Sequence, residues 1–119
     1  MPLCILAGAK TLTLAAGLFA LSWTHSVEKV EWQETWRVTR TGLQIVEARI
    51  RGSGAGMEPP PDARLEDGWW IYSPKLGPVP ELRLAASGAT VSPWHLCAAG
   101  DCHDLGAAPG APIVVRPCR

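Results

Sequence analysis

One histidine and three glutamates lie close together in residues 21–37, a stretch that also holds three of the six tryptophans. Imidazole and carboxylate groups ligate zinc and transfer protons. On strands, His25 and Glu34 would share one face, whereas Glu31 would point to the other. Only two ligands converge, one fewer than a catalytic zinc site needs, so we predict no metal and no cofactor. The simpler interpretation is a hydrogen bond between His25 and Glu34 on a half-buried face.

Hydrolysis is the other chemistry that these residue types suggest. Ser26 directly follows His25, and neighbours on a strand point to opposite faces, which prevents a base-to-nucleophile hydrogen bond between them. The Gly52-Ser53-Gly54 run lacks the Gly-x-Ser-x-Gly pattern of a nucleophile elbow. Glu34 and Glu58 are carboxylates of the type that cleaves glycosides, at a separation that the sequence does not define. A small hydrolase or metal-dependent enzyme using His25, Glu34 and Glu58 is therefore the alternative to a protein without catalytic activity.

The tryptophan content favours recognition over catalysis. Six indole rings are more than one small core buries completely, and adjacent tryptophans on a strand point to opposite faces. Exposed aromatic rings beside charged groups mark partner or small-ligand sites, and packing in the core is the alternative role. The tryptophans are Trp23, Trp32, Trp36, Trp69, Trp70 and Trp94.

A hairpin is the element that would position the histidine and the glutamates. Apolar and aromatic residues alternate with polar ones on both sides of Glu28-Lys29. With these two residues as the loop, Trp23 would face Glu34, and His25 would face Trp32. His25 and Glu34 then become diagonal neighbours within reach of each other. A helix over 27–38 is the competing assignment, which the strict alternation and the β-branched and aromatic residues disfavour.

The remainder of the chain reads as short strands between glycine and proline turns. Twelve glycines and eleven prolines interrupt 119 residues too often for long helices. We therefore predict one all-β domain over residues 1–119, a small β-sandwich or partly closed barrel of short antiparallel strands. The expected further strands are 3–7, 12–16, 43–50, 68–72, 82–86, the hairpin partners 93–97 and 102–105, and 111–115.

Composition restricts the partners. Eleven basic and eleven acidic residues give a formal net charge of zero, so we expect no nucleic-acid binding. The apolar residues 3–21 lack a basic leading region and are interrupted by Lys10, and we predict neither a signal peptide nor a membrane span there. Contact with a membrane is expected only through a partner. The cytoplasmic side is favoured on these grounds, with the periplasm as the alternative.

Four cysteines supply the possible covalent links. Their spacing matches neither a zinc ribbon nor a thioredoxin motif, so we predict no metal-thiolate site. A tight hairpin would bring Cys97 opposite Cys102, and a bond between Cys4 and Cys118 would tie the termini together. Such disulfides require an oxidising compartment, and four reduced, mostly buried thiols are the alternative.

Two runs carry a resemblance to a known family: Trp23-Thr24-His25-Ser26-Val27-Glu28-Lys29, and Gly52-Ser53-Gly54-Ala55-Gly56-Met57. With Trp32, Glu34 and Arg37 between them, they resemble the bacterial domain-of-unknown-function family 1850. The resemblance extends from Leu3-Cys4 to Arg116-Pro117-Cys118. Members are often encoded beside TAXI-type TRAP transporters, which import solutes across the inner membrane. The resemblance implies an accessory role in uptake and supplies no catalytic residue.

These observations together predict a non-enzymatic binding or accessory protein for a TRAP-type solute uptake system. Its partner would be a transporter subunit, a small-molecule solute, or both. The recognition surface would combine the His25 hairpin with the glycine-rich loop, using Trp23, His25, Ser26, Glu28, Glu34, Gly54, Gly56, Met57 and Glu58.

Overall fold

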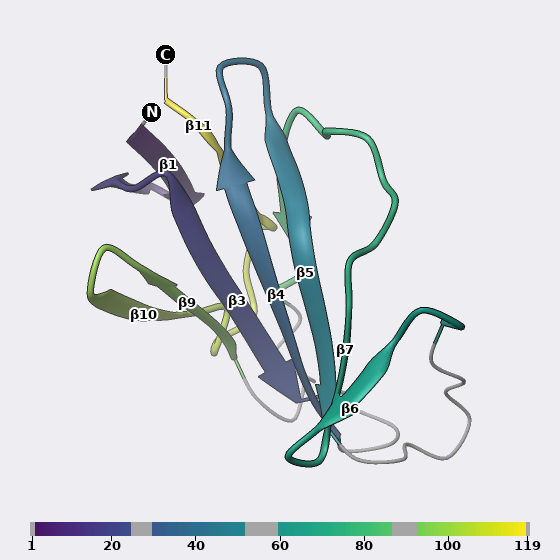
Figure 1. Cartoon of the computed structure of the whole chain (residues 1–119). Helices are drawn as coiled ribbons and strands as arrows, with labels where there is room; N and C mark the ends of the chain where they lie inside the picture. The colour runs from purple at the N-terminus through teal and green to yellow at the C-terminus, as the bar shows by residue number, and fades with distance from the viewer. Residues whose placement is uncertain (1, 25–29, 52–59, 87–92, 119) are drawn as a thin grey trace.

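The computed structural model describes residues 2–24, 30–51, 60–86 and 93–118. These residues form two antiparallel β-sheets that face each other and do not close into a barrel (Figure 1). The predicted all-β sandwich of short antiparallel strands is therefore confirmed. Within the described ranges, no helix is long and apolar enough to span a membrane.

The smaller sheet contains both ends of the chain and has the strand order β2-β1-β11-β8. The apolar N-terminal segment forms two of its strands, joined at Gly8-Ala9, as the glycine break predicts. The N- and C-terminal ends lie side by side (Figure 1) because β1 pairs with β11. The strands are β1 (Pro2–Ala7), β2 (Lys10–Ala15), β8 (Leu82–Leu84) and β11 (Ile113–Pro117).

The larger sheet has the order β10-β9-β3-β4-β5-β7-β6 and holds the candidate site. Its centre is the predicted meander β3-β4-β5, and residues 31–38 are strand, not helix. The short strand β6 escapes the sequence analysis because only three residues form it. The strands are β3 (Leu18–Thr24), β4 (Glu31–Val38), β5 (Leu43–Arg51), β6 (Arg64–Glu66), β7 (Trp69–Tyr72), β9 (Trp94–Ala98) and β10 (Asp101–Leu105).

The core lies between the sheets and is built from alternate residues of each strand. On β3, Phe19 and Leu21 are buried, and on β1, Leu3 and Ile5 are fully buried. No charged or polar residue among those described is fully buried. The other members of the core cluster are Ala16, Trp36, Val38, Leu43, Ile45, Leu84, Ala86, Leu96, Ala98, Leu105, Ile113 and Val115.

A β-bulge in β5 keeps its apolar residues on the core face. Thr35 pairs with Glu47 and Trp36 pairs with Ile45, which leaves Val46 as an extra residue on β5. The inward positions of this strand therefore change phase at the bulge. The faces of β4 and β5 stay matched along their whole length, including the part that carries the candidate site.

Two hairpins close through loops of two residues with positive φ. Asp67 and Gly68 have φ of 51° and 84°, and Ala99 and Gly100 have φ of 52° and 84°. Two left-handed residues in succession form the turn whose twist matches antiparallel strands. The Ala99-Gly100 turn sets the register of β9 against β10.

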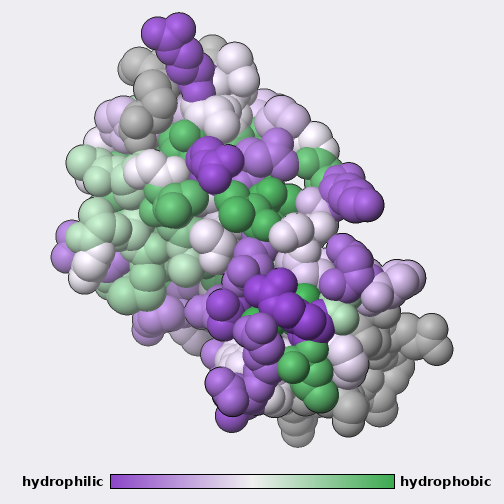
Figure 2. Space-filling model, viewed as in Figure 1, coloured by the Kyte–Doolittle hydropathy of each residue, from purple (hydrophilic) through white to green (hydrophobic). Residues whose placement is uncertain are grey.

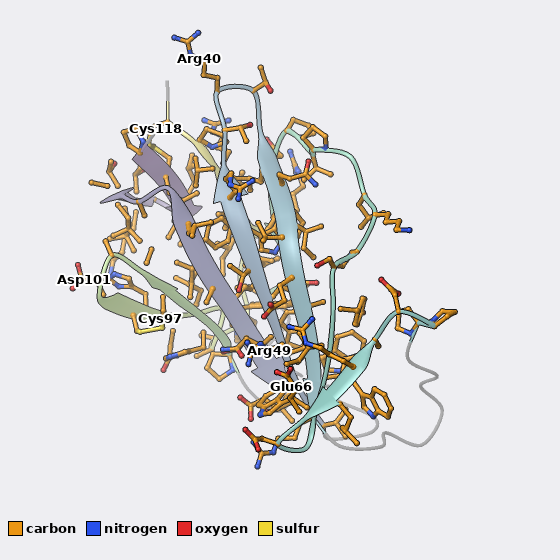
Figure 3. All side chains as sticks on the ribbon, viewed as in Figure 1. Arg40, Arg49, Glu66, Cys97, Asp101 and Cys118 are labelled. Carbon is orange, nitrogen blue, oxygen red and sulfur yellow. A yellow bond between two sulfur atoms is a disulfide. The ribbon has the colours of Figure 1, made fainter. Side chains whose placement is uncertain are left out.

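Two disulfides join the same cysteines that the sequence analysis paired. Cys97 lies directly opposite Cys102 in the β9–β10 hairpin, with Cα atoms 4.0 Å apart. Figure 3 shows this bond on the outer side of the hairpin. Cys4 of β1 is bonded to Cys118 at the end of the described chain, with Cα atoms 5.0 Å apart. One bond therefore closes a short hairpin, and the other links the two termini.

Candidate functional site

Three tryptophans meet on the inner face of the larger sheet. Trp23 stacks on Trp32 with ring centroids 6.0 Å apart and an angle of 14° between the rings. Trp94 of β9 packs against Trp23 at 4.9 Å with a tilt of 54°, and its Nε1 donates to the carbonyl oxygen of Ala85 at 2.9 Å. Trp23 and Trp94 pack against the core but remain half-buried. This aromatic cluster, Trp23, Trp32 and Trp94, therefore contacts both the core and the surface.

The register of the β3–β4 hairpin differs from the predicted one. Trp23 pairs with Trp32 and not with Glu34, which lies opposite Leu21. The shift is two residues, so all of these side chains stay on their predicted face. The predicted loop residues Glu28-Lys29 lie outside the described ranges. The physical reason is twofold: Glu-Lys lacks the Gly or Asn that a two-residue hairpin loop favours, and this register stacks the two indoles.

Glu34 lies on the inner face of β4, next to aromatic residues. Its Oε1 accepts a hydrogen bond of 3.0 Å from Nε1 of Trp36, whose side chain is 6 % exposed. Burial raises the pKa of Glu34, and the hydrogen bond from Trp36 offsets part of that rise. Burial also raises the pKa of Tyr72, and the nearby Glu34 carboxylate raises it further. A half-buried carboxyl group with a raised pKa thus lies close to Trp36 and Tyr72.

Most of the predicted recognition residues lie outside the part of the chain that the structure describes. The proposed partnership of His25 with Glu34 falls there too, so the described contact of Glu34 is the one with Trp36. Of the predicted set, the structure places Trp23 and Glu34, both on the inner face of the larger sheet. The residues outside the described ranges are His25, Ser26, Glu28, Gly54, Gly56, Met57 and Glu58.

A shallow depression of about 330 Å³ opens beside the aromatic cluster. It combines a tryptophan ring with hydroxyl, imidazole and carboxylate groups, which offer both an apolar contact and hydrogen bonds to a bound molecule. A larger depression of about 410 Å³ lies at the Cys4–Cys118 bond and has no aromatic ring in its wall. We therefore regard the smaller depression as the better candidate. Its wall consists of Ser22, Trp23, Thr24, Glu31, Pro93, His95 and Asp104.

His95 and Asp104 are site residues that the sequence analysis did not place. They pair across the β9–β10 hairpin, and Nδ1 of His95 lies 2.6 Å from Oδ1 of Asp104. Ser22 of β3 pairs with His95 on the other side. The signal was present in the sequence: a two-residue loop at Ala99-Gly100 puts His95 opposite Asp104 by counting outward from the turn.

Ser22, His95 and Asp104 lie side by side on three neighbouring strands and are the residue types of a hydrolase catalytic triad. No hydrogen bond joins Ser22 to His95 in the described part of the chain, whereas a triad needs that contact for proton transfer. β3 is paired on both sides, so its backbone donors take part in the sheet and do not form an oxyanion hole. The arrangement therefore supports binding better than nucleophilic catalysis.

The outer face of the same sheet is polar near this end. Figure 2 shows hydrophilic side chains gathered over the lower parts of β4 and β5. Arg49 donates from Nε to Glu47 at 2.6 Å, and the Arg51 guanidinium lies 5.2 Å from the centroid of the Trp69 ring. These contacts pair charged groups on the solvent side of the sheet. The depression also opens mainly on this side, and Trp23 is the member of the aromatic cluster that reaches its wall.

A protein-family model described as Domain of unknown function (DUF1850) matches residues 19–105. The matched span begins in β3 and ends with β10, so it contains the aromatic cluster, Glu34 and the depression. It is shorter than the nearly complete resemblance inferred from the sequence, because it leaves out β1, β2 and β11. No curated protein and no solved structure matches the chain significantly.

Proposed function

Because this chain belongs to the Domain of unknown function (DUF1850) family, we propose that it is a non-enzymatic binding protein accessory to a TRAP-type solute uptake system. The observation that carries the binding role is the half-buried aromatic cluster beside the depression of about 330 Å³. The partner is supported by the resemblance to a family whose members are often encoded beside such transporters. Two disulfides support an oxidising compartment, so within this proposal the periplasm replaces the cytoplasmic side favoured by the sequence.

The chemistry of the site defines what it recognises. Indole rings provide flat apolar area with little loss of conformational freedom, and Glu31 provides an exposed charge at the rim. Glu34 lies on the inner face with Trp32, outside the wall of the depression, and burial raises its pKa. A surface of this kind takes an apolar side chain or a small organic solute that also carries a hydrogen-bond donor or a positive charge.

Recovery of transporter subunits from membranes of the source bacterium tests the partner. Tagged wild-type protein is compared with Glu31→Arg, which reverses the charge at the rim of the depression. The matched control is Arg40→Glu, also an exposed charge reversal, in the turn at the far end of the sheet (Figure 3). Circular dichroism and tryptophan fluorescence establish that each variant folds.

We expect wild type and Arg40→Glu to recover transporter subunits and Glu31→Arg to recover far less. If folded wild-type protein recovers no transporter subunit, the transporter role is wrong. Equal recovery by all three proteins would place the partner elsewhere on the molecule and contradict the assignment of this surface.

A further inference from the structure

The outer face of the β9–β10 hairpin presents four side chains that can ligate a metal. His95 lies opposite Asp104, and Cys97 lies opposite Cys102, so the four occupy two adjacent pairs. The intervening residue Leu96 is fully buried, which shows that these four point away from the core. His95 and Asp104 are 49 % and 62 % exposed, so a metal ion reaches them from solvent.

The distances suit a tetrahedral zinc ion. A ring nitrogen of His95 and the sulfurs of Cys97 and Cys102 all lie within 4.8 Å of one another. Bond lengths of about 2.3 Å to sulfur and about 2.0 Å to nitrogen put tetrahedral ligands roughly 3.5–3.8 Å apart. Small side-chain rotations therefore bring the three atoms to the required spacing once the two sulfurs separate.

The contact between His95 and Asp104 holds the histidine ring in place. Nδ1 of His95 is occupied by the carboxylate at 2.6 Å, which leaves Nε2 as the nitrogen for a metal. A metal-bound histidine usually donates its second ring N–H to a carboxylate, which orients the ring and makes it a stronger ligand. His95, held by the Asp104 carboxylate next to two cysteines, therefore has the arrangement that is common for histidine ligands of zinc.

We propose that this hairpin binds one Zn²⁺ through His95, Cys97 and Cys102 when its disulfide is reduced, with Asp104 orienting the histidine. A dithiol reductant transfers two electrons and two protons to the disulfide and becomes a disulfide itself. The two thiols then lose their protons as the thiolates bind Zn²⁺. The oxidised hairpin has no thiolate and binds no zinc, so disulfide and metal exclude each other.

Three protein ligands leave the fourth position of the ion open. Structural zinc sites have four protein ligands, whereas an open position accepts water or a ligand group. His95 and Asp104 also line the depression beside the aromatic cluster. The open position therefore lies beside this depression, where water or a ligand atom from solvent would reach the zinc.

Cysteine spacing alone argues against this site. Cys97 and Cys102 are five residues apart, unlike the pairs of zinc ribbons, and the histidine comes before them in an unfamiliar order. The site exists because cross-strand pairing, and not sequence proximity, puts the ligands together. Opposite and diagonal positions on one face of a hairpin lie close enough for their side chains to share one ion.

Titration of full-length protein with Co²⁺ and Zn²⁺, before and after reduction by a dithiol, tests the proposal. Co²⁺ is the spectroscopic probe because its bond to thiolate gives a sulfur-to-metal charge-transfer band that Zn²⁺ abolishes. Cys97→Ser/Cys102→Ser removes the site but keeps the Cys4–Cys118 pair, which controls for binding by the other thiols. His103→Ala is the matched control for His95→Ala, because His103 pairs with buried Leu96 and faces inward.

We expect the reduced wild type to bind one metal ion per chain with the charge-transfer band and the oxidised protein to show none. His95→Ala should weaken zinc binding tenfold or more, Asp104→Ala about 10–100-fold, and His103→Ala not measurably. Absence of the band in reduced, folded wild type overturns the proposal. So does an equal band in Cys97→Ser/Cys102→Ser, or unchanged zinc affinity in His95→Ala.

Discussion

Two substitutions of Glu34 separate its roles as hydrogen-bond acceptor and as buried charge. Glu34→Gln retains a carbonyl oxygen that accepts from Nε1 of Trp36 and removes the charge. Glu34→Ala removes both. Because the two variants are neutral at every pH, the difference between them measures mainly the loss of the acceptor for the Trp36 indole.

The structure determines the expected magnitude. Trp36 is 6 % exposed, so water does not readily replace the lost oxygen. A buried donor left without an acceptor costs about 1–3 kcal/mol, and we expect Glu34→Ala to be less stable than Glu34→Gln by this amount. At neutral pH, Glu34→Gln should be at least as stable as wild type, because burial penalises the charged carboxylate.

The pH dependence of stability has a defined sign. Burial raises the pKa of Glu34 in the folded state, so this group binds a proton more readily in the folded protein than in the unfolded chain. The resulting stabilisation is fully present below the pKa of the unfolded chain and is lost as the pH rises through the raised folded-state pKa. Relative to Glu34→Gln, wild type should lose stability as the pH rises across this interval.

Urea unfolding of the disulfide-intact proteins, followed by tryptophan fluorescence at several pH values, measures these differences. Equal free energies of unfolding for Glu34→Ala and Glu34→Gln would refute the role of the Trp36 hydrogen bond. A difference between wild type and Glu34→Gln that does not change with pH would show that burial does not perturb this carboxyl group.

Two other substitutions test the backbone that supports the sheets. A Cβ at Gly42 would overlap the backbone oxygen of Val79. Val79 accepts a hydrogen bond of 2.7 Å from Leu43 N–H and donates one of 2.9 Å to the Leu43 carbonyl oxygen, and the overlap would disturb both. Gly42→Ala should therefore lower the free energy of unfolding in urea by about 1–3 kcal/mol. Gly77→Ala is its control and should be nearly neutral, since a Cβ there meets nothing within 4 Å; equal effects would show that the overlap is relieved without cost. Ala99 has φ of 52°, a left-handed conformation that asparagine adopts more readily than alanine. Ala99→Asn should therefore raise the free energy of unfolding by about 0.5–1 kcal/mol. A lower melting temperature for this variant would contradict the turn geometry.

Local alternation predicts the strands and their inward faces correctly for most of this chain. Trp32, Glu34 and Trp36 share the core side as expected, and the glycine break near Gly8 separates β1 from β2. These features depend on a period of two residues and on turn chemistry, both of which neighbouring residues specify. Local counting from the Ala99-Gly100 turn puts Cys97 opposite Cys102, whereas the Cys4–Cys118 bond depends on the distant pairing of β1 with β11.

Register and phase changes are harder to obtain from the sequence. A two-residue shift places Trp23 opposite Trp32 without moving either ring to another face, so alternation does not distinguish the two registers. The extra residue Val46 similarly has no local signature, because its effect is to match β5 with β4 across the sheet.

The sequence by itself determined an all-β chain, the positions of most of its strands, its apolar faces and its family resemblance. Only the tertiary structure decided that β9 lies against β3, which places His95 beside the aromatic cluster and puts two cysteines, a histidine and an aspartate on one exposed face. The reason is physical: alternation is a property of a single strand, whereas the choice of neighbours depends on which distant strands bury the most apolar surface together.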